Sequence, residues 1–389
     1  MDTPLITSPV GILATLTGVA SFFFLLEKST QWRLFDFFPP LLFIYAVPLI
    51  CSNRDVIPNE SPLYDWMGDA VLPMFLILML LDVDVLAAVR IMGKGILVLL
   101  CGTAGVVLGA PVAYLLVKGG LGPESWKGFG VLAGSWIGGT GNMAAVNEGL
   151  KATPADFGLA VMADAMVYLI WLPILLGSKK CANWFNRIAR VSPERIKMLE
   201  RSSGKLSKEK GKPEMRHLLY LLFLGFFFTW LATELAVWLP EVPPVLSTKT
   251  WNILLVTTFG VVLSMTPAKK IPGSRELAVA LVYLFVAQMG AKADVSGLAQ
   301  QAPWFLLGAY LWIFTHGAFC LLGAIVLRVD IHSTAIASAA NIGGIASAPI
   351  VAAYHNQKLV PVSILMALIG YAIGNYGAFA AAWLCWLVS

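Results

Sequence analysis

Two stretches of the chain decide its fold: Ser135-Trp136-Ile137-Gly138-Gly139-Thr140-Gly141-Asn142 and Ala340-Asn341-Ile342-Gly343-Gly344-Ile345-Ala346-Ser347. Each sets a glycine pair among small and amide residues inside an apolar stretch. Broken segments at corresponding places in the two halves of a membrane protein indicate the substrate site of a secondary transporter. The duplication therefore predicts two related halves with a binding site between them.

Composition identifies the solvent around the chain. Of the 389 residues, 58% are hydrophobic and 13% are charged, with a mean hydropathy of +0.78, whereas about 25% of the residues in soluble domains are charged. Apolar runs long enough to cross roughly 30 Å of hydrocarbon recur along the whole chain. We therefore predict an all-α polytopic membrane protein without a soluble domain.

Ten membrane spans are predicted from these runs. They cover residues 9–26, 38–51, 66–81, 95–117, 157–177, 217–239, 251–266, 276–290, 304–327 and 360–387. The two glycine-pair segments, 128–150 and 334–354, remain, and each is either a re-entrant hairpin or a broken crossing helix.

Charge favours re-entrance. Residues 179–216 hold nearly half of the 27 basic residues, so this segment is expected to be cytoplasmic. With two re-entrant segments each half has five crossings, both chain termini lie outside, and the other basic clusters also lie inside. Crossing segments would instead put the clusters at Arg90/Lys94 and Lys269/Lys270 outside, against the usual bias.

An odd number of crossings per half makes the second half an inverted copy of the first. Asp84-Val85 after the third span matches Asp294-Val295 after the eighth. We predict inverted repeats at 1–178 and 217–389, joined by a basic cytoplasmic linker at 179–216. The positive charge of the linker serves to orient the protein and to contact anionic lipid, and predicts no nucleic-acid partner.

Several classes of function lack a sequence signal. The five cysteines are scattered and the histidines are isolated, so neither a metal site nor a cofactor is predicted. No Ser/His/Asp or Cys/His arrangement predicts an enzyme. The first apolar run has no positive n-region and is expected to be retained. A multi-pass protein of the bacterial inner membrane is the simplest location.

The glycine pairs and their polar neighbours are the predicted substrate site. Glycine allows tight turns and close approach of a ligand, and the helix N-termini after the turns offer N–H groups to a carboxylate. The alternative is close helix packing through small residues, as in GxxxG interfaces. The predicted substrate-binding residues are Gly138, Gly139, Thr140, Asn142, Ser338, Asn341, Gly343, Gly344, Ser347 and Asn375.

Ionisable groups within the membrane are the second signal, because they are costly there and usually functional. Asp164, Glu148 and the adjacent Asn147 are the predicted ion-coupling residues, for Na⁺ or H⁺. Asp164 has an alternative as a structural acid bonded to a neighbouring helix, and Glu148 as a boundary residue in water. His316 is expected to be a hydrogen-bonded core histidine.

The motif at 134–142, paired with that at 338–344, resembles the YjcL-like integral membrane family, known as domain of unknown function 819. This family is grouped with the cation:proton antiporter and anion transporter superfamily. The resemblance implies an inverted-repeat transporter, a homodimer, and elevator-like movement of a core against a scaffold. The chain lacks the intramembrane arginine with which 2-hydroxycarboxylate carriers bind carboxylates, which argues against a di- or tricarboxylate.

The function expected from these features is ion-coupled transport of a small organic anion or zwitterion, such as an amino acid or a short peptide. A Na⁺/H⁺ antiporter is the alternative, although antiporters of the superfamily usually present an Asp-Asp or Asn-Asp pair that is not visible in this sequence. A membrane sensor or assembly factor is a third possibility, which gives no reason for duplicated broken segments.

Overall fold

The computed structural model describes residues 4–30, 32, 35, 40–83, 91–192, 211–293 and 298–389. Within these residues the regular structure is helical, apart from one isolated bridge between Val242 and Leu246. The prediction of an all-α protein is therefore confirmed. Asp84, Asp294 and residues 193–210 of the basic linker lie outside the described residues.

The helices of the first half follow the predicted spans. They are α1 (Pro9–Thr30), α3 (Pro40–Asn53), α4 (Pro62–Trp66), the π-helical turn η1 (Met67–Val71), α5 (Leu72–Leu80), α7 (Lys94–Val117), η2 (Lys118–Gly120), α8 (Trp126–Leu150) and α9 (Pro154–Gly177). α4, η1 and α5 run on without interruption as one helical stretch.

The linker and the second half continue in the same manner. Their helices are η3 (Ser178–Cys181), α10 (Ala182–Ile188), α12 (Met215–Ala236), α13 (Thr248–Ser264), η4 (Pro267–Lys270), α14 (Ser274–Ala291), α15 (Leu298–Leu327), α16 (Ile331–Ile342), α17 (Gly344–Asn356), η5 (Gln357–Leu359) and α18 (Val360–Leu387).

Each of the ten predicted spans coincides with a helical stretch to within a few residues. Eight helical stretches among the described residues are long and apolar enough to cross a membrane, which makes this a multi-pass membrane protein. The 14 residues of α3 and the 17 of α13 are shorter. At 1.5 Å per residue they reach about 21 and 26 Å, less than the roughly 30 Å of a hydrocarbon core.

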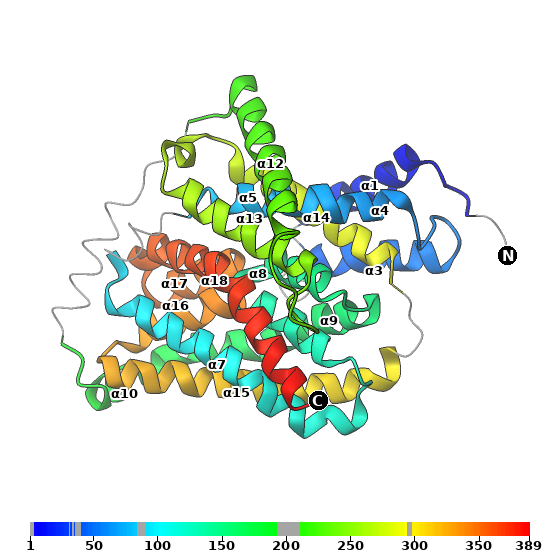
Figure 1. The fold of residues 1–389 in the computed structure, drawn as a ribbon. Helices are drawn as coiled ribbons and strands as arrows, with labels where there is room; N and C mark the ends of the chain where they lie inside the picture. Colours follow the sequence, from blue (N-terminus) through cyan, green and yellow to red (C-terminus); the bar gives the residue numbers. More distant parts are fainter. Residues whose placement is uncertain are drawn as a thin grey trace.

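The helices pack as two bundles (Figure 1). We call the group of α1, α3, α4, α5, α12, α13 and α14 the flanking bundle, and the group of α7, α8, α9 and α15 to α18 the hairpin bundle. Both take helices from both halves of the chain, because α3 packs on α14, α13 on α5 and α7 on α15. The two predicted repeats are therefore interleaved in space.

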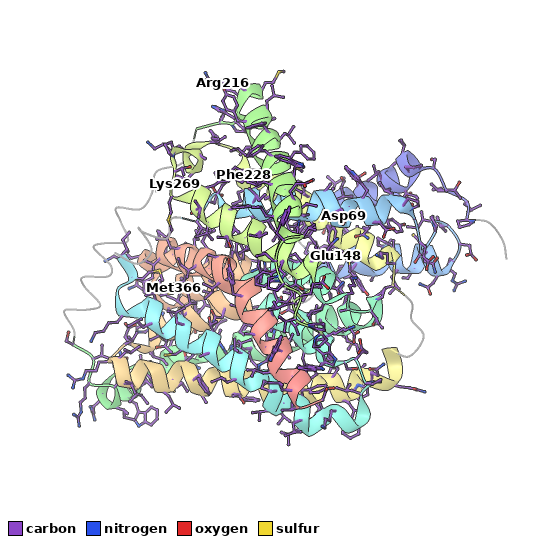
Figure 2. All side chains as sticks on the ribbon, in the orientation of Figure 1. Asp69, Glu148, Arg216, Phe228, Lys269 and Met366 are labelled. Carbon is purple, nitrogen blue, oxygen red and sulfur yellow. The ribbon has the colours of Figure 1, made fainter. Side chains whose placement is uncertain are left out.

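Side chains project outward from α12 of the flanking bundle (Figure 2), and several of the exposed ones are large and apolar. On α12, Phe223 is 64% exposed and Trp230 is 56% exposed. Exposed apolar surface on this scale is unfavourable in water and natural in hydrocarbon. The outer face of α12 is thus suited to contact lipid.

The start of the basic linker packs against the second glycine-pair segment. Phe185 of α10 is buried, and the Asn186 side chain accepts a hydrogen bond from the Ile331 N–H at 3.1 Å. Lys179 Nζ donates to the Tyr354 carbonyl at 2.6 Å. This part of the linker packs against the start of α16 and the end of α17, because an aromatic anchor and a helix cap hold it there.

Candidate functional site

The first glycine pair breaks α8 into two limbs at Gly139, where φ is 72° and ψ is −175°. This backbone conformation is essentially restricted to glycine. A Cβ placed on Gly134 would lie 2.9 Å from the Asn142 carbonyl oxygen, although residues eight apart in a straight helix are about 12 Å apart. The two limbs of α8 therefore fold back on one another as a hairpin.

The second glycine pair forms the same kind of break between α16 and α17. Gly344 has a φ of 56°, again in the region that favours glycine. The Nδ1 atoms of His332 and His355, near the far ends of the two limbs, lie 2.9 Å apart. α16 and α17 therefore also form a helical hairpin whose tip is the glycine pair.

The tips of both hairpins meet one residue of α18, Tyr371. A Cβ placed on Gly139 would lie 2.9 Å from Tyr371 Cε1, and one on Gly344 would lie 3.6 Å from the Tyr371 hydroxyl. A Cβ on the preceding Gly370 would overlap the Ile137 carbonyl oxygen and lie 3.9 Å from that of Ala340. The structure thus brings the two duplicated motifs together around a short segment of α18.

Asn142 occupies the turn after the first tip. Its amide Nδ2 donates a hydrogen bond to the Tyr371 carbonyl at 3.0 Å, while its Oδ1 is buried and lacks a partner among the described residues. Side chains at Gly138 and Gly374 would overlap this amide. Glycine at both positions therefore lets the amide lie between the hairpin and α18.

Asn341 has a related arrangement in the second hairpin. Its Nδ2 donates to the Leu99 carbonyl of α7 at 3.2 Å, and its Oδ1 is also buried without a described partner. Asn375 of α18 donates to the Thr257 hydroxyl of α13 at 2.8 Å and likewise has an unpaired Oδ1. Buried polar oxygens normally have a partner, so such atoms suit a bound ion, water or ligand.

Ser338 is used by a hydrogen-bond network behind the tips. His316 Nδ1 lies 2.9 Å from the Gly102 carbonyl and His316 Nε2 lies 2.9 Å from the Ser338 hydroxyl, which also accepts from Trp171 Nε1 at 3.0 Å. Because a carbonyl accepts only, Nδ1 carries the proton and Ser338 donates to Nε2. His316 is the hydrogen-bonded core residue that its sequence predicted, and its network occupies the Ser338 hydroxyl.

Asp164 and Tyr168 project from adjacent turns of α9 toward the two hairpins. The Asp164 carboxyl lies near the side chains of Ser135 and Trp136, in the first limb of α8. Tyr168 lies beside the other tip, since a Cβ on Gly343 would be 3.0 Å from its ring. Asp164 Oδ1, Trp136 Nε1 and the Tyr168 hydroxyl are buried without a hydrogen bond to a described residue.

Asp164 has no ion pair among the described residues. An unpaired acid inside an apolar span is costly, and this cost falls when a proton or a cation binds. Ser347, near the second tip, also lies close to Tyr168. α9 therefore places the Asp164 carboxyl beside the first predicted motif and the Tyr168 phenol beside the second.

Glu148 lies at the far end of the α8 hairpin from the tip. Its carboxylate is 3.3 Å from Lys249 Nζ of α13, which also bonds to Asp69 (Figure 2). Nine residues separate Glu148 from Gly139, or about 13 Å of helix. Glu148 thus joins the hairpin bundle to the flanking bundle, as a boundary residue would, and Asn147 beside it has a buried unpaired Oδ1.

Sequence reasoning missed Tyr371, Tyr168 and Trp136. A signal for α18 was present: Gly370, Gly374 and Gly377 recur on one helix face, and each would meet the first limb of α8 if it carried a side chain. No group of three or more His, Cys, Asp or Glu side chains in the described parts of the chain could hold a metal ion.

The similarity to known proteins extends over most of the chain. A family model described as a protein of unknown function (DUF819) matches residues 13–387, which include both hairpins. The uncharacterized membrane protein YjcL of Bacillus subtilis (strain 168) is 28% identical over 350 residues, covering 87% of this chain and 88% of that protein. The family resemblance of the paired motifs is confirmed, and its superfamily placement stays a prediction.

Proposed function

The chain belongs to the DUF819 family of membrane proteins, and we propose that it is an ion-coupled secondary transporter of a small organic anion or zwitterion. The observation that carries the proposal is the meeting of both hairpin tips at Tyr371. Non-helical backbone at membrane depth is tolerated only where it is buried in protein or lines a cavity. Two such breaks that face one residue are the arrangement of a substrate site between repeats.

Limb length supports re-entrance. The limbs of the first hairpin have 13 and 11 residues on either side of Gly139, and α16 has 12, so each extends about 16 to 20 Å. A crossing needs roughly 30 Å. In our proposal both hairpins enter the membrane part-way and return, and their tips lie at depth.

The order of helices supports inverted repeats. In each half three helical stretches of the flanking bundle, with α4 to α5 as one stretch, precede a long helix, a hairpin and a final helix. The contact of α3 with α14 has a counterpart in the contact of α13 with α5, as a two-fold relation requires. Five crossings and one hairpin per half then make the second repeat an inverted copy of the first.

The polar atoms at the tips suit a carboxylate and a cation. The second limb of α8 begins after Gly139 and α17 begins at Gly344, so the N-terminal end of each limb lies at a tip. Helix N-termini favour anions. The unpaired oxygens of Asn142, Asn341 and Asp164 favour Na⁺ or a proton nearby.

Transport in this proposal occurs by movement of the hairpin bundle against the flanking bundle, which carries substrate and ion together. The ion pair of Lys249 with Glu148 is one of the contacts that such a movement would change. The homodimer, the inner-membrane location and the cytoplasmic linker are predictions that the family resemblance and the basic residues support.

A thermal-shift screen of the purified protein with amino acids, short peptides and organic acids, each with and without Na⁺, tests the proposal. A ligand that binds the folded state raises its apparent stability by mass action. Hits are then tested for uptake into proteoliposomes under an imposed Na⁺ or proton gradient. Gradient-dependent uptake supports transport, and its absence for every hit refutes it.

The Na⁺/H⁺ antiporter keeps one specific observation in its favour, the buried Asp164 Oδ1, which has no hydrogen bond to a described residue. The same proteoliposomes separate the two functions. An antiporter acidifies or alkalinises the lumen when Na⁺ is added without any organic solute. A symporter moves protons or Na⁺ only when its substrate is present.

A further inference from the structure

The antiparallel pair of α7 and α15 carries an open groove on its outer face. A Cβ on Gly323 of α15 would lie 2.7 Å from Cys101 of α7, so the two helices are in close contact at this level. Toward the other end of the pair, Gly109 of α7 meets Trp312 of α15. The residue numbers rise on one helix as they fall on the other, which defines the antiparallel register.

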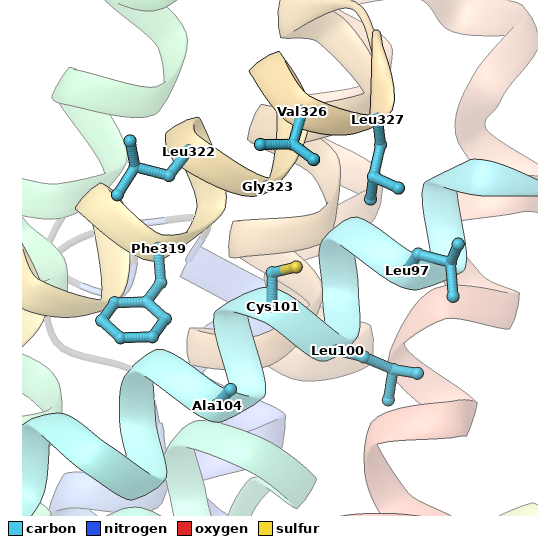
Figure 3. A pocket seen from close by; sticks show the side chains of 9 residues that line it. All are labelled: Leu97, Leu100, Cys101, Ala104, Phe319, Leu322, Gly323, Val326 and Leu327. Atoms are coloured by element: carbon cyan, nitrogen blue, oxygen red, sulfur yellow. The ribbon is translucent and has the colours of Figure 1, made fainter.

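The groove above this contact has a volume of about 580 Å³ (Figure 3). Its walls are apolar side chains from both helices, and Leu97 is 43% exposed and Val326 is 78% exposed. These side chains surround a floor made by the small residues Cys101 and Gly323. The walls include Leu97, Leu100 and Ala104 of α7 with Phe319, Leu322 and Val326 of α15.

Two basic residues lie at one end of the groove. Lys94 is seven residues before Cys101, and Arg328 is five residues after Gly323. Given the antiparallel register, both lie toward the same end, about 11 and 8 Å along the helix axes from that contact. Both are exposed. Lys94 is also three residues before Leu97, so it shares the helix face that lines the groove.

We propose that this groove binds an anionic phospholipid, with an acyl chain along the groove and the phosphate group at Lys94 and Arg328. Helices that cross a bilayer meet acyl chains on their outward faces, and a groove with a floor of small residues admits a chain where a flat helix face does not. An anionic headgroup gains about fivefold in affinity from each basic residue near the membrane surface. The two basic residues at one end of the groove determine the orientation of the bound lipid.

The proposed lipid site lies directly behind the second hairpin. α7 accepts the hydrogen bond of Asn341 through the Leu99 carbonyl, and α15 holds Ser338 through His316. A lipid that binds both α7 and α15 thus stabilises the helices on which α16 rests. This inference is independent of the transported substrate, because it needs only that the protein spans a membrane.

Native mass spectrometry of the full-length, delipidated protein tests the proposal, with phosphatidylglycerol and phosphatidylcholine of identical acyl chains as the two probes. The wild type is expected to retain phosphatidylglycerol more tightly. Lys94→Gln together with Arg328→Gln should weaken phosphatidylglycerol binding by roughly 25-fold, fivefold for each charge, and leave phosphatidylcholine binding unchanged. Arg54→Gln with Lys151→Gln removes the same charge away from the groove and should have no effect.

A second variant tests the groove itself. Ala104→Phe fills the groove while keeping both basic residues, and should weaken the binding of both lipids. Equal retention of the two lipids by the wild type would overturn the proposal. So would unchanged binding by the double variant or by Ala104→Phe, or a cross-link between Cys101 residues of two copies in liposomes, because a second copy would then cover the groove.

Discussion

Gly139 allows the most direct perturbation of the hairpin tips. Its φ of 72° and ψ of −175° place it in a region that is essentially restricted to glycine, and holding another residue there costs about 1 to 3 kcal/mol. Gly139→Ala adds a Cβ 2.9 Å from Tyr371 Cε1. A contact this close forces the ring or the tip to shift, at a further cost of about 1 to 3 kcal/mol.

The two costs have different consequences. Backbone strain lowers the stability of the folded protein, whereas the shift at Tyr371 changes the geometry that both tips share. If the shift at Tyr371 destabilises the substrate-binding conformation by about 1 to 3 kcal/mol, the affinity for the substrate drops by about 5- to 150-fold. We therefore expect Gly139→Ala to fold, to melt a few degrees lower and to lose most of its uptake at low substrate concentration.

Two matched variants separate these effects. Gly93 has a φ of 50°, and a Cβ added there would lie within 4 Å of no other described residue, so Gly93→Ala should lower the melting temperature without changing the apparent affinity. Gly344 has a φ of 56°, and an added Cβ there would meet Tyr371 at the ordinary distance of 3.6 Å. Gly344→Ala should therefore lose less affinity than Gly139→Ala.

The assay is proteoliposome uptake of a substrate identified in the thermal-shift screen, together with the melting temperature of each purified variant. A folded Gly139→Ala that matched Gly93→Ala in both the apparent affinity and the maximal rate of uptake would refute a role of the tips in binding. The contact at Tyr371 would then have no part in binding.

Four further predictions follow from the same geometry. Asp164→Asn should keep the fold and some substrate binding but lose the dependence of uptake on the ion gradient; an unchanged response to both Na⁺ and pH would make Asp164 structural. Glu148→Gln should change stability by at most about 1 kcal/mol, because its pair with Lys249 is partly exposed, and should leave ion coupling intact; lost coupling would move the ion site to Glu148. His316→Ala should cost about 2 to 5 kcal/mol, seen as a lower melting temperature, because it leaves a cavity and unpaired polar groups; an unchanged melting temperature would contradict the network. Cysteines placed at the two chain termini of a cysteine-free variant should label only from outside the cell, and labelling of both termini and of the 179–216 linker from the cytoplasm would exclude five crossings per half.

Local sequence determined which segments are helices and where they break. Apolar runs of span length predicted ten helical stretches, because hydrocarbon leaves the backbone no partner except itself. The positions of the breaks were also predictable from the sequence, since Gly139 and Gly344 adopt conformations that other residues avoid. The expectation for His316 also held, because an isolated histidine in an apolar span must find hydrogen-bond partners.

Only the tertiary structure decided which residues meet. Tyr371 contacts two tips that lie more than 200 residues apart in sequence, and Lys249 reaches Glu148 from another helix about 100 residues away. Helices that are apolar on every side carry no amphipathic pattern to say which face packs inward. Their register depends on small residues and hydrogen bonds contributed by neighbours. The chain therefore encodes the broken helices locally, and the partners of each polar side chain emerge only when the helices pack.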